Sequence, residues 1–145
     1  MAVMPRGFSS YGKRIEEAAW SPAVDLLLCF GAQVDGVGGL LGDGNGFADL
    51  TLAILAARGG FAPQGVIAAI GSSADFFQDQ RFVQDDWDIQ AGAFISESGA
   101  VLFEAGPSAG MLPAIFWELL PPRRIRKISS LWKLSQQNAP QPDTT

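Results

Sequence analysis

The order of two apolar runs, a glycine-rich segment and a helix-patterned segment restricts the fold of this chain more than any other feature. The apolar runs cover residues 24–30 and 66–70. Between them lie a loop at 31–46 that is too rich in glycine for regular structure, and a stretch at 47–58 with apolar residues at helical spacing. Strand, loop, helix and strand in this order predict a βαβ unit.

Each apolar run also fits a helix. Residues 24–30 suit either a buried strand or the inner face of a helix that begins at Ser21 and Pro22. Residues 63–70 fit a helix with Pro63 in its first turn. We favour the strands, so the sequence predicts an α/β fold with a small mixed sheet. An α+β fold is the alternative.

The rest of the chain predicts several helices and one β-hairpin. The hairpin is expected where two apolar stretches, 93–96 and 100–104, flank Glu97, Ser98 and Gly99. Helices are expected at 12–20, 73–82, 114–120 and 123–137. We expect a single globular domain over 1–137 and a disordered polar tail at 138–145.

The chain contains no histidine, and this absence limits its chemistry. Histidine is the usual general base at neutral pH, a common zinc ligand and the partner of a nucleophilic Ser or Cys. We therefore expect no zinc site, no activated Ser or Cys, and no cofactor. The single cysteine, Cys29, lies inside the first apolar run and is expected to be a buried thiol.

The glycine-rich loop and the start of the next segment carry the side chains best suited to a ligand or cation: Asp35, Asp43, Asn45 and Asp49. A glycine loop between a strand and a helix is where α/β folds bind ligands. Carboxylates without a neighbouring Lys or Arg oppose a nucleotide phosphate, and the full spacing of an EF-hand is absent. A weak cation or polyol site is one interpretation, and a solvated turn is the other.

Residues Gln33, Val34, Asp35, Gly36 and Val37 follow the first apolar run. This short stretch resembles the first motif of haloacid-dehalogenase-type phosphatases. The nucleophilic aspartate of that family falls on Gln33 in this chain. The resemblance therefore implies that covalent phosphatase chemistry is absent.

Acidic residues gather around Trp87, including Asp85, Asp86 and Asp88. Paired carboxylates beside an aromatic ring could act as acid and base on a sugar, with the ring as a stacking platform. Such pairs are normally found in much larger chains. A solvated acidic face is therefore the favoured interpretation.

The C-terminal segment combines basic and apolar residues at helical spacing. It holds half of the ten Lys and Arg residues, although the net charge of the chain is −5. The basic residues are Arg123, Arg124, Arg126, Lys127 and Lys133, and Ile125, Ile128, Leu131 and Trp132 are predicted to share an apolar face. This pattern predicts an amphipathic helix. Docking on the acidic body of its own chain is the first expectation for it, and contact with a partner chain or a neighbouring protomer is the second, ahead of a membrane surface or nucleic acid.

No stretch matches a reaction-specific motif, and only 17% of the residues are charged. The sequence therefore favours a non-catalytic assembly or adaptor subunit that uses the C-terminal basic helix. The alternative is a hydrolase-type enzyme that depends on a small ligand or cation bound at 31–49.

The partner is expected to be a protein or a second copy of the chain. The negative net charge opposes nucleic-acid binding, and a membrane surface is less favoured than a protein. No uncharged window reaches the length of a membrane span. The sequence therefore predicts a cytoplasmic protein.

Overall fold

The computed structural model describes residues 10–13, 23–104 and 113–138, and these residues contain mixed sheets and helices, as expected for an α/β or α+β fold. The strands are β1 (Val24–Phe30), β2 (Gln33–Asp35), β3 (Leu40–Leu41), β4 (Phe61–Ile70), β5 (Phe76–Phe77), β6 (Ala93–Ser96) and β7 (Gly99–Leu102). The helices are α2 (Phe47–Ala57), α3 (Pro122–Lys127) and α4 (Ser129–Asn138), with 3-10 turns η2 (Ser73–Asp75) and η3 (Trp117–Leu119). The helix predicted at 12–20 and the tail predicted at 138–145 lie largely outside the described residues.

The predicted βαβ unit is confirmed. β1 and β4 are parallel neighbours, with Leu27 beside Ile67 and Cys29 beside Ala69, and α2 connects them. Both apolar runs are therefore strands, although β4 begins five residues earlier than the run at 66–70. The main sheet has the order β1-β4-β6-β7, and the predicted hairpin is confirmed as the antiparallel pair β6 and β7.

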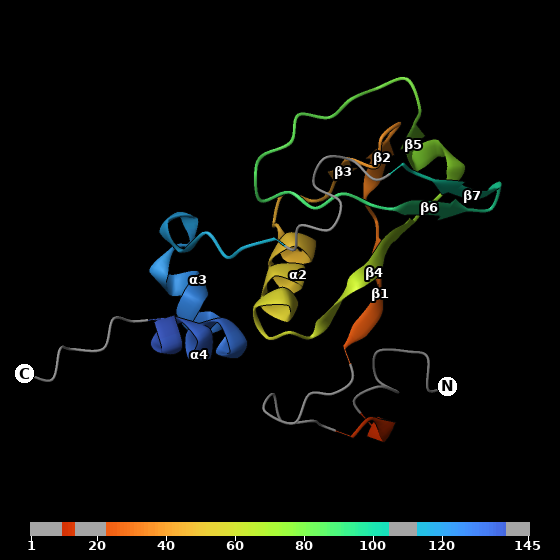
Figure 1. Ribbon diagram of the computed structural model, residues 1–145. Helices are drawn as coiled ribbons and strands as arrows, with labels where there is room; N and C mark the ends of the chain where they lie inside the picture. The colour runs from red at the N-terminus through yellow and green to blue at the C-terminus, as the bar shows by residue number, and fades with distance from the viewer. Residues whose placement is uncertain (1–9, 14–22, 105–112, 139–145) are drawn as a thin grey trace, which may run out of the picture.

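One face of the main sheet is covered by α2 and by a smaller sheet of order β3-β2-β5. Leu27 and Cys29 of β1 belong to the same apolar cluster as Leu52 of α2. Nearer the carboxyl ends of the strands, Ala69 and Phe94 belong to a second cluster with residues of the small sheet. Figure 1 shows α2 beside β1 and β4, with the small sheet above them. This arrangement places the loop before α2 at the carboxyl end of β1.

Asp35, at the end of β2, joins segments that are distant in the sequence. It is 1% exposed, and its carboxylate accepts hydrogen bonds from the backbone N–H groups of Val37 (2.9 Å), Gly39 (2.8 Å) and Phe82 (2.8 Å). Burial raises the pKa of Asp35, but these hydrogen bonds and the positive charge of Arg81 lower it more, so the pKa lies below its ordinary value. Asp35 therefore fixes both the turn after β2 and the path of the chain at Phe82.

The helix predicted at 73–82 is wrong beyond its first turn. Ser72 caps the short turn η2, and the chain then forms β5, which pairs in parallel with β2. The ring of Phe76 stacks on Phe94 with centroids 5.5 Å apart and contacts Phe103 at 6.1 Å. Packing of the Phe76 ring between the two sheets outweighs the local preference for a helix.

The loop at 31–46 is more ordered than its glycine content predicts. It contains β2 and β3, which form an antiparallel pair. Gly38, in the turn between them, has a φ of 90°, and a Cβ atom at this position would lie 2.3 Å from the carbonyl oxygen of Ala91. The glycine therefore allows a close backbone approach that no other residue permits.

The continuous helix predicted at 123–137 is also wrong, because the chain is extended at Ile128 (φ −105°, ψ 107°) and forms the two helices α3 and α4. Leu131 is completely buried, whereas Trp132 is 44% exposed. The residues predicted to share one apolar face are therefore divided between different environments. The helix predicted at 114–120 is reduced to η3.

Candidate ligand pocket

A pocket of about 810 Å³ opens at the carboxyl end of β1, where the glycine-rich loop leads into α2. Its other walls come from the segment around Trp87 and from the chain between Ala114 and Arg124. Ligands of α/β folds commonly bind outside the carboxyl ends of parallel strands. The volume suits a small organic molecule, since such pockets typically measure about 300 to 1,000 Å³.

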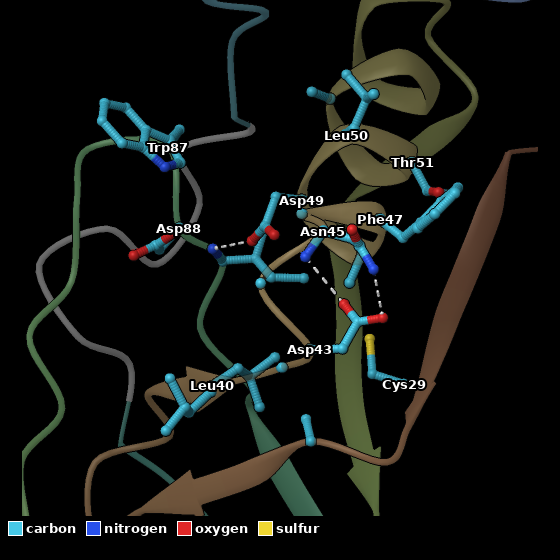
Figure 2. Close-up of a pocket in the computed structure, with 18 of the residues that line it drawn as sticks. Cys29, Leu40, Asp43, Asn45, Phe47, Asp49, Leu50, Thr51, Trp87 and Asp88 are labelled. Carbon is cyan, nitrogen blue, oxygen red and sulfur yellow. Dashed lines mark hydrogen bonds between the residues drawn. The ribbon is translucent and has the colours of Figure 1, made fainter. Parts of the chain in front are cut away.

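Asp43 and Asn45 form the turn that precedes α2. The backbone N–H of Asn45 donates to Asp43 Oδ1 at 3.0 Å, and Asn45 Nδ2 donates to Asp43 Oδ2 at 2.9 Å. The side-chain hydrogen bond and then the backbone hydrogen bond from Asn45 hold the pKa of Asp43 below its ordinary value, so its carboxylate is ionised at neutral pH. Figure 2 shows both side chains near the N-terminal end of α2.

Asp49 connects the first turn of α2 to the segment that carries Trp87. The backbone N–H of Ile89 donates to Asp49 Oδ1 at 3.0 Å, and Asp88 Oδ2 accepts a hydrogen bond of 2.8 Å from the backbone of Asp85. Figure 2 shows Asp49 extending toward this segment. A carboxylate has about four lone-pair sites, so Asp49 and Asp88 keep capacity for a ligand.

Arg124 of α3 reaches the loop that precedes α2. Its Nη2 donates a short hydrogen bond to the carbonyl oxygen of Asn45, and its guanidinium carbon lies 5.9 Å from the centroid of the Phe47 ring. Trp87 and Phe116 meet edge to face, with centroids 5.9 Å apart. Aromatic rings on separate segments therefore accompany the polar groups of the pocket.

Cys29 lies at the pocket wall on β1, but its thiol is not suited to nucleophilic chemistry. Burial, and then the negative charge of Asp49, raise the pKa of the Cys29 thiol above its ordinary value. The thiolate is the reactive form of cysteine, and both effects disfavour it. This agrees with the sequence-based expectation of a buried thiol.

The structure brings together part of each predicted set of site residues. Asp43, Asn45 and Asp49 line the pocket, whereas Asp35 does not. The predicted partner-binding residues lie in different environments. Leu131 is buried, Ile125 and Ile128 are half-buried, and the exposed residues are Arg123, Arg126, Lys127, Trp132 and Lys133.

Arg124 lines the pocket. It therefore contacts its own chain, as expected if the basic segment docks on the body of the same chain.

Sequence reasoning did not place Trp87, Asp88 or Phe116 in this pocket. Trp87 and Asp88 belong to the acidic stretch that was interpreted as a solvated face. The aromatic ring of Trp87 within that stretch was the one sequence feature that pointed to a binding site there. Phe116 has no comparable signal, because its contact with Trp87 spans distant parts of the chain.

Neither the protein-family models nor the curated proteins compared with this chain match it. Among residues 10–13, 23–104 and 113–138, no group of three or more His, Cys, Asp or Glu side chains could hold a metal ion. Within the same ranges, no helix has the length and apolar character needed to cross a membrane.

Proposed function

We propose that this chain binds a small amine-bearing molecule with an apolar or aromatic body. The observation that carries this proposal is the convergence of Asp43, Asp49 and Asp88 on one pocket that also contains aromatic rings. Arg124 is the only basic residue among the described residues that line it. Carboxylates therefore outnumber cations, which favours a cationic ligand over an anionic one.

The apolar side of the ligand has its own support. Trp87, Phe116 and Phe47 each line the pocket. An aromatic ring or a carbon chain placed among them loses contact with water, and a ligand cation near a ring face gains a cation–π interaction. A molecule with both features therefore fits better than a metal ion or a phosphate. Hydrolysis of the bound molecule stays a prediction from the sequence.

We expect Asp49→Asn to weaken the binding of 2-phenylethylamine about tenfold, because a hydrogen bond to a charged group contributes roughly 1.5 kcal/mol or more. The Asn side chain keeps an oxygen that can accept from Ile89, so the change removes mainly the charge. The measurement is an NMR titration that follows the backbone amides of the loop before α2 and the indole N–H of Trp87.

The matched control is Asp25→Asn, which removes the same charge from an exposed position of β1 that does not line the pocket. 3-Phenylpropanoate, which carries a carboxylate in place of the amine, is the ligand control and should bind at least about tenfold more weakly. Equal binding of the two compounds, or an equal loss in Asp25→Asn, would contradict the proposal.

A second candidate function is assembly with an acidic protein surface, as the sequence favours. Arg123, Arg126 and Lys127 are exposed on α3, and the chain as a whole carries a net charge of −5. A basic helix on an acidic body is suited to contact the acidic body of another protomer.

Reversing Arg123, Arg126 and Lys127 to Glu should weaken such a contact several-fold at low ionic strength and have little effect at high salt. Exposed charges are screened over about 8 to 10 Å near physiological ionic strength, so added salt should mimic the substitution. Sedimentation at both ionic strengths measures this. Association that is equally strong in the variant at low salt would exclude the basic helix as the contact.

A further inference from the structure

The face of the main sheet opposite α2 carries a continuous set of apolar side chains. Leu26, Leu28 and Phe30 alternate along β1 with Leu27 and Cys29, which point toward α2. The strand register places Val66, Ile95 and Leu102 on the same side as Leu26, Leu28 and Phe30. All six are exposed, and we call this set the open face.

Small residues lie between these larger side chains. Ala68 of β4 is the register partner of both Leu28 and Ala93, and Ala93 in turn pairs with Leu102. Ala68 and Ala93 are 2% and 6% exposed, so they are buried between the larger residues of β1 and those of β7. No Asp, Glu, Lys or Arg occupies the positions that the described register places on this face.

An apolar face of this kind is unusual for a sheet with parallel strands. Parallel strands are normally covered on both faces, and their sequences are apolar on both sides. β1 has that composition, yet the two apolar clusters of residues 23–104 place α2 and the small sheet against one face.

We propose that a second copy of this chain covers the open face. At about 3.3 Å per residue and 4.8 Å between strands, the sheet covers about 400 Å² in projection, which is the size of the largest apolar patch on a typical monomer, and such patches often have a function. Two such faces together cover about 800 Å² in projection. Accessible area exceeds projected area where side chains protrude, so the six exposed side chains on each copy bring the contact closer to the roughly 1,200 Å² of specific interfaces.

A second copy fits this face because a two-fold axis places the same patch on both sides of the contact. Each copy then offers a neutral, apolar surface to another neutral, apolar surface, and no charge is buried without a partner. A partner that depended on charged side chains would find none to pair with among the described positions of this face. The net charge of −5 per chain stays outside the contact.

The test compares the intact chain with the double variant Leu26→Lys/Leu102→Lys. Leu26 lies on β1 and is 52% exposed, and Leu102 lies on β7 and is 80% exposed. Leu28 and Phe30 also line the ligand pocket and are left unchanged. Val37→Lys, at a 43% exposed position outside both the main sheet and the ligand pocket, is the matched control. Sedimentation velocity is measured from about 1 to 200 μM, which brackets the micromolar dissociation constants of small interfaces.

We expect the intact chain and Val37→Lys to form a dimer that persists at high salt, because apolar burial is not screened. The double variant should raise the dimer dissociation constant at least about 100-fold, since it places unpaired charges between apolar surfaces. Circular dichroism should show that it stays folded. Because this dimer resists salt, it is distinguishable from a contact made by the basic residues of α3.

Three results would overturn the proposal. A dimer that survives the double substitution places the interface elsewhere. A monomer at all concentrations that floats with phosphatidylcholine vesicles assigns the face to a lipid surface. A monomer that does not float, and whose Leu26 and Leu102 methyl groups are shielded from a soluble paramagnetic probe, assigns the face to another segment of the same chain.

Discussion

Replacing Asp35 with Asn is expected to lower the free energy of unfolding by about 3 kcal/mol at neutral pH. The carboxylate accepts from Val37 and Gly39 through Oδ1 and from Phe82 through Oδ2. An amide in the same place presents an N–H group to one of these buried donors, which then has no acceptor. Urea denaturation followed by circular dichroism measures the loss.

The pH dependence of this loss identifies its cause. The pKa of Asp35 is lower in the folded chain than its ordinary value of 3.8, so ionised Asp35 contributes its full stability above that value. The contribution declines as the pH falls through the folded pKa. The difference between the intact chain and Asp35→Asn should therefore be constant near neutral pH and shrink below pH 3.8.

Asp25→Asn serves again as the control, because Asp25 is exposed and its substitution should change stability by no more than about 0.5 kcal/mol. A stability difference for Asp35→Asn that does not change in acid would show that the charge of Asp35 is not responsible. The amides near Phe82 should also exchange faster with solvent in the variant, since they lose the connection to β2.

Local patterns were sufficient to predict the central part of this fold. The apolar runs at 24–30 and 66–70 and the helical spacing at 47–58 each specify one element, and their order specifies the crossover. The hairpin at 93–102 is specified by Glu97, Ser98 and Gly99. In these segments the local preference and the tertiary contacts agree.

The elements that were missed depend on contacts between distant residues. Phe76 becomes part of a strand because its ring packs on Phe94 and Phe103, and nothing in the local sequence carries that information. The short strands β2 and β3 likewise depend on the hydrogen bonds of Asp35 and on the close approach at Gly38. The break at Ile128 has no local signal such as proline or glycine.

The candidate pocket was predictable for the residues that adjoin the βαβ unit. Asp43, Asn45 and Asp49 follow from the position of a polar glycine loop between a strand and a helix. Trp87, Asp88 and Arg124 reach the same pocket through the long segment after β5 and through α3. These residues come together only in the tertiary fold, and a single sequence does not show which distant segments lie side by side.

Phe94→Ala should lower the free energy of unfolding by about 3 to 5 kcal/mol, the usual cost of removing a buried ring. Phe94 is 1% exposed and packs with Val34, Ala69 and Ala91 beneath the small sheet, where it also stacks on Phe76. The substitution leaves a cavity between the two sheets that the backbone cannot easily close. Urea denaturation is performed below the concentration at which the chain associates.

Ile95→Ala, at the next position of β6, is the matched comparison. Ile95 points to the open face and is 40% exposed, so in the monomer its truncation should cost about 1 kcal/mol, since little apolar area is returned to water. At concentrations that favour the dimer, the same substitution should weaken self-association instead. Equal losses of monomer stability for Phe94→Ala and Ile95→Ala would mean that both faces of the sheet are buried within one chain, which would contradict the two-layer packing and the open face together.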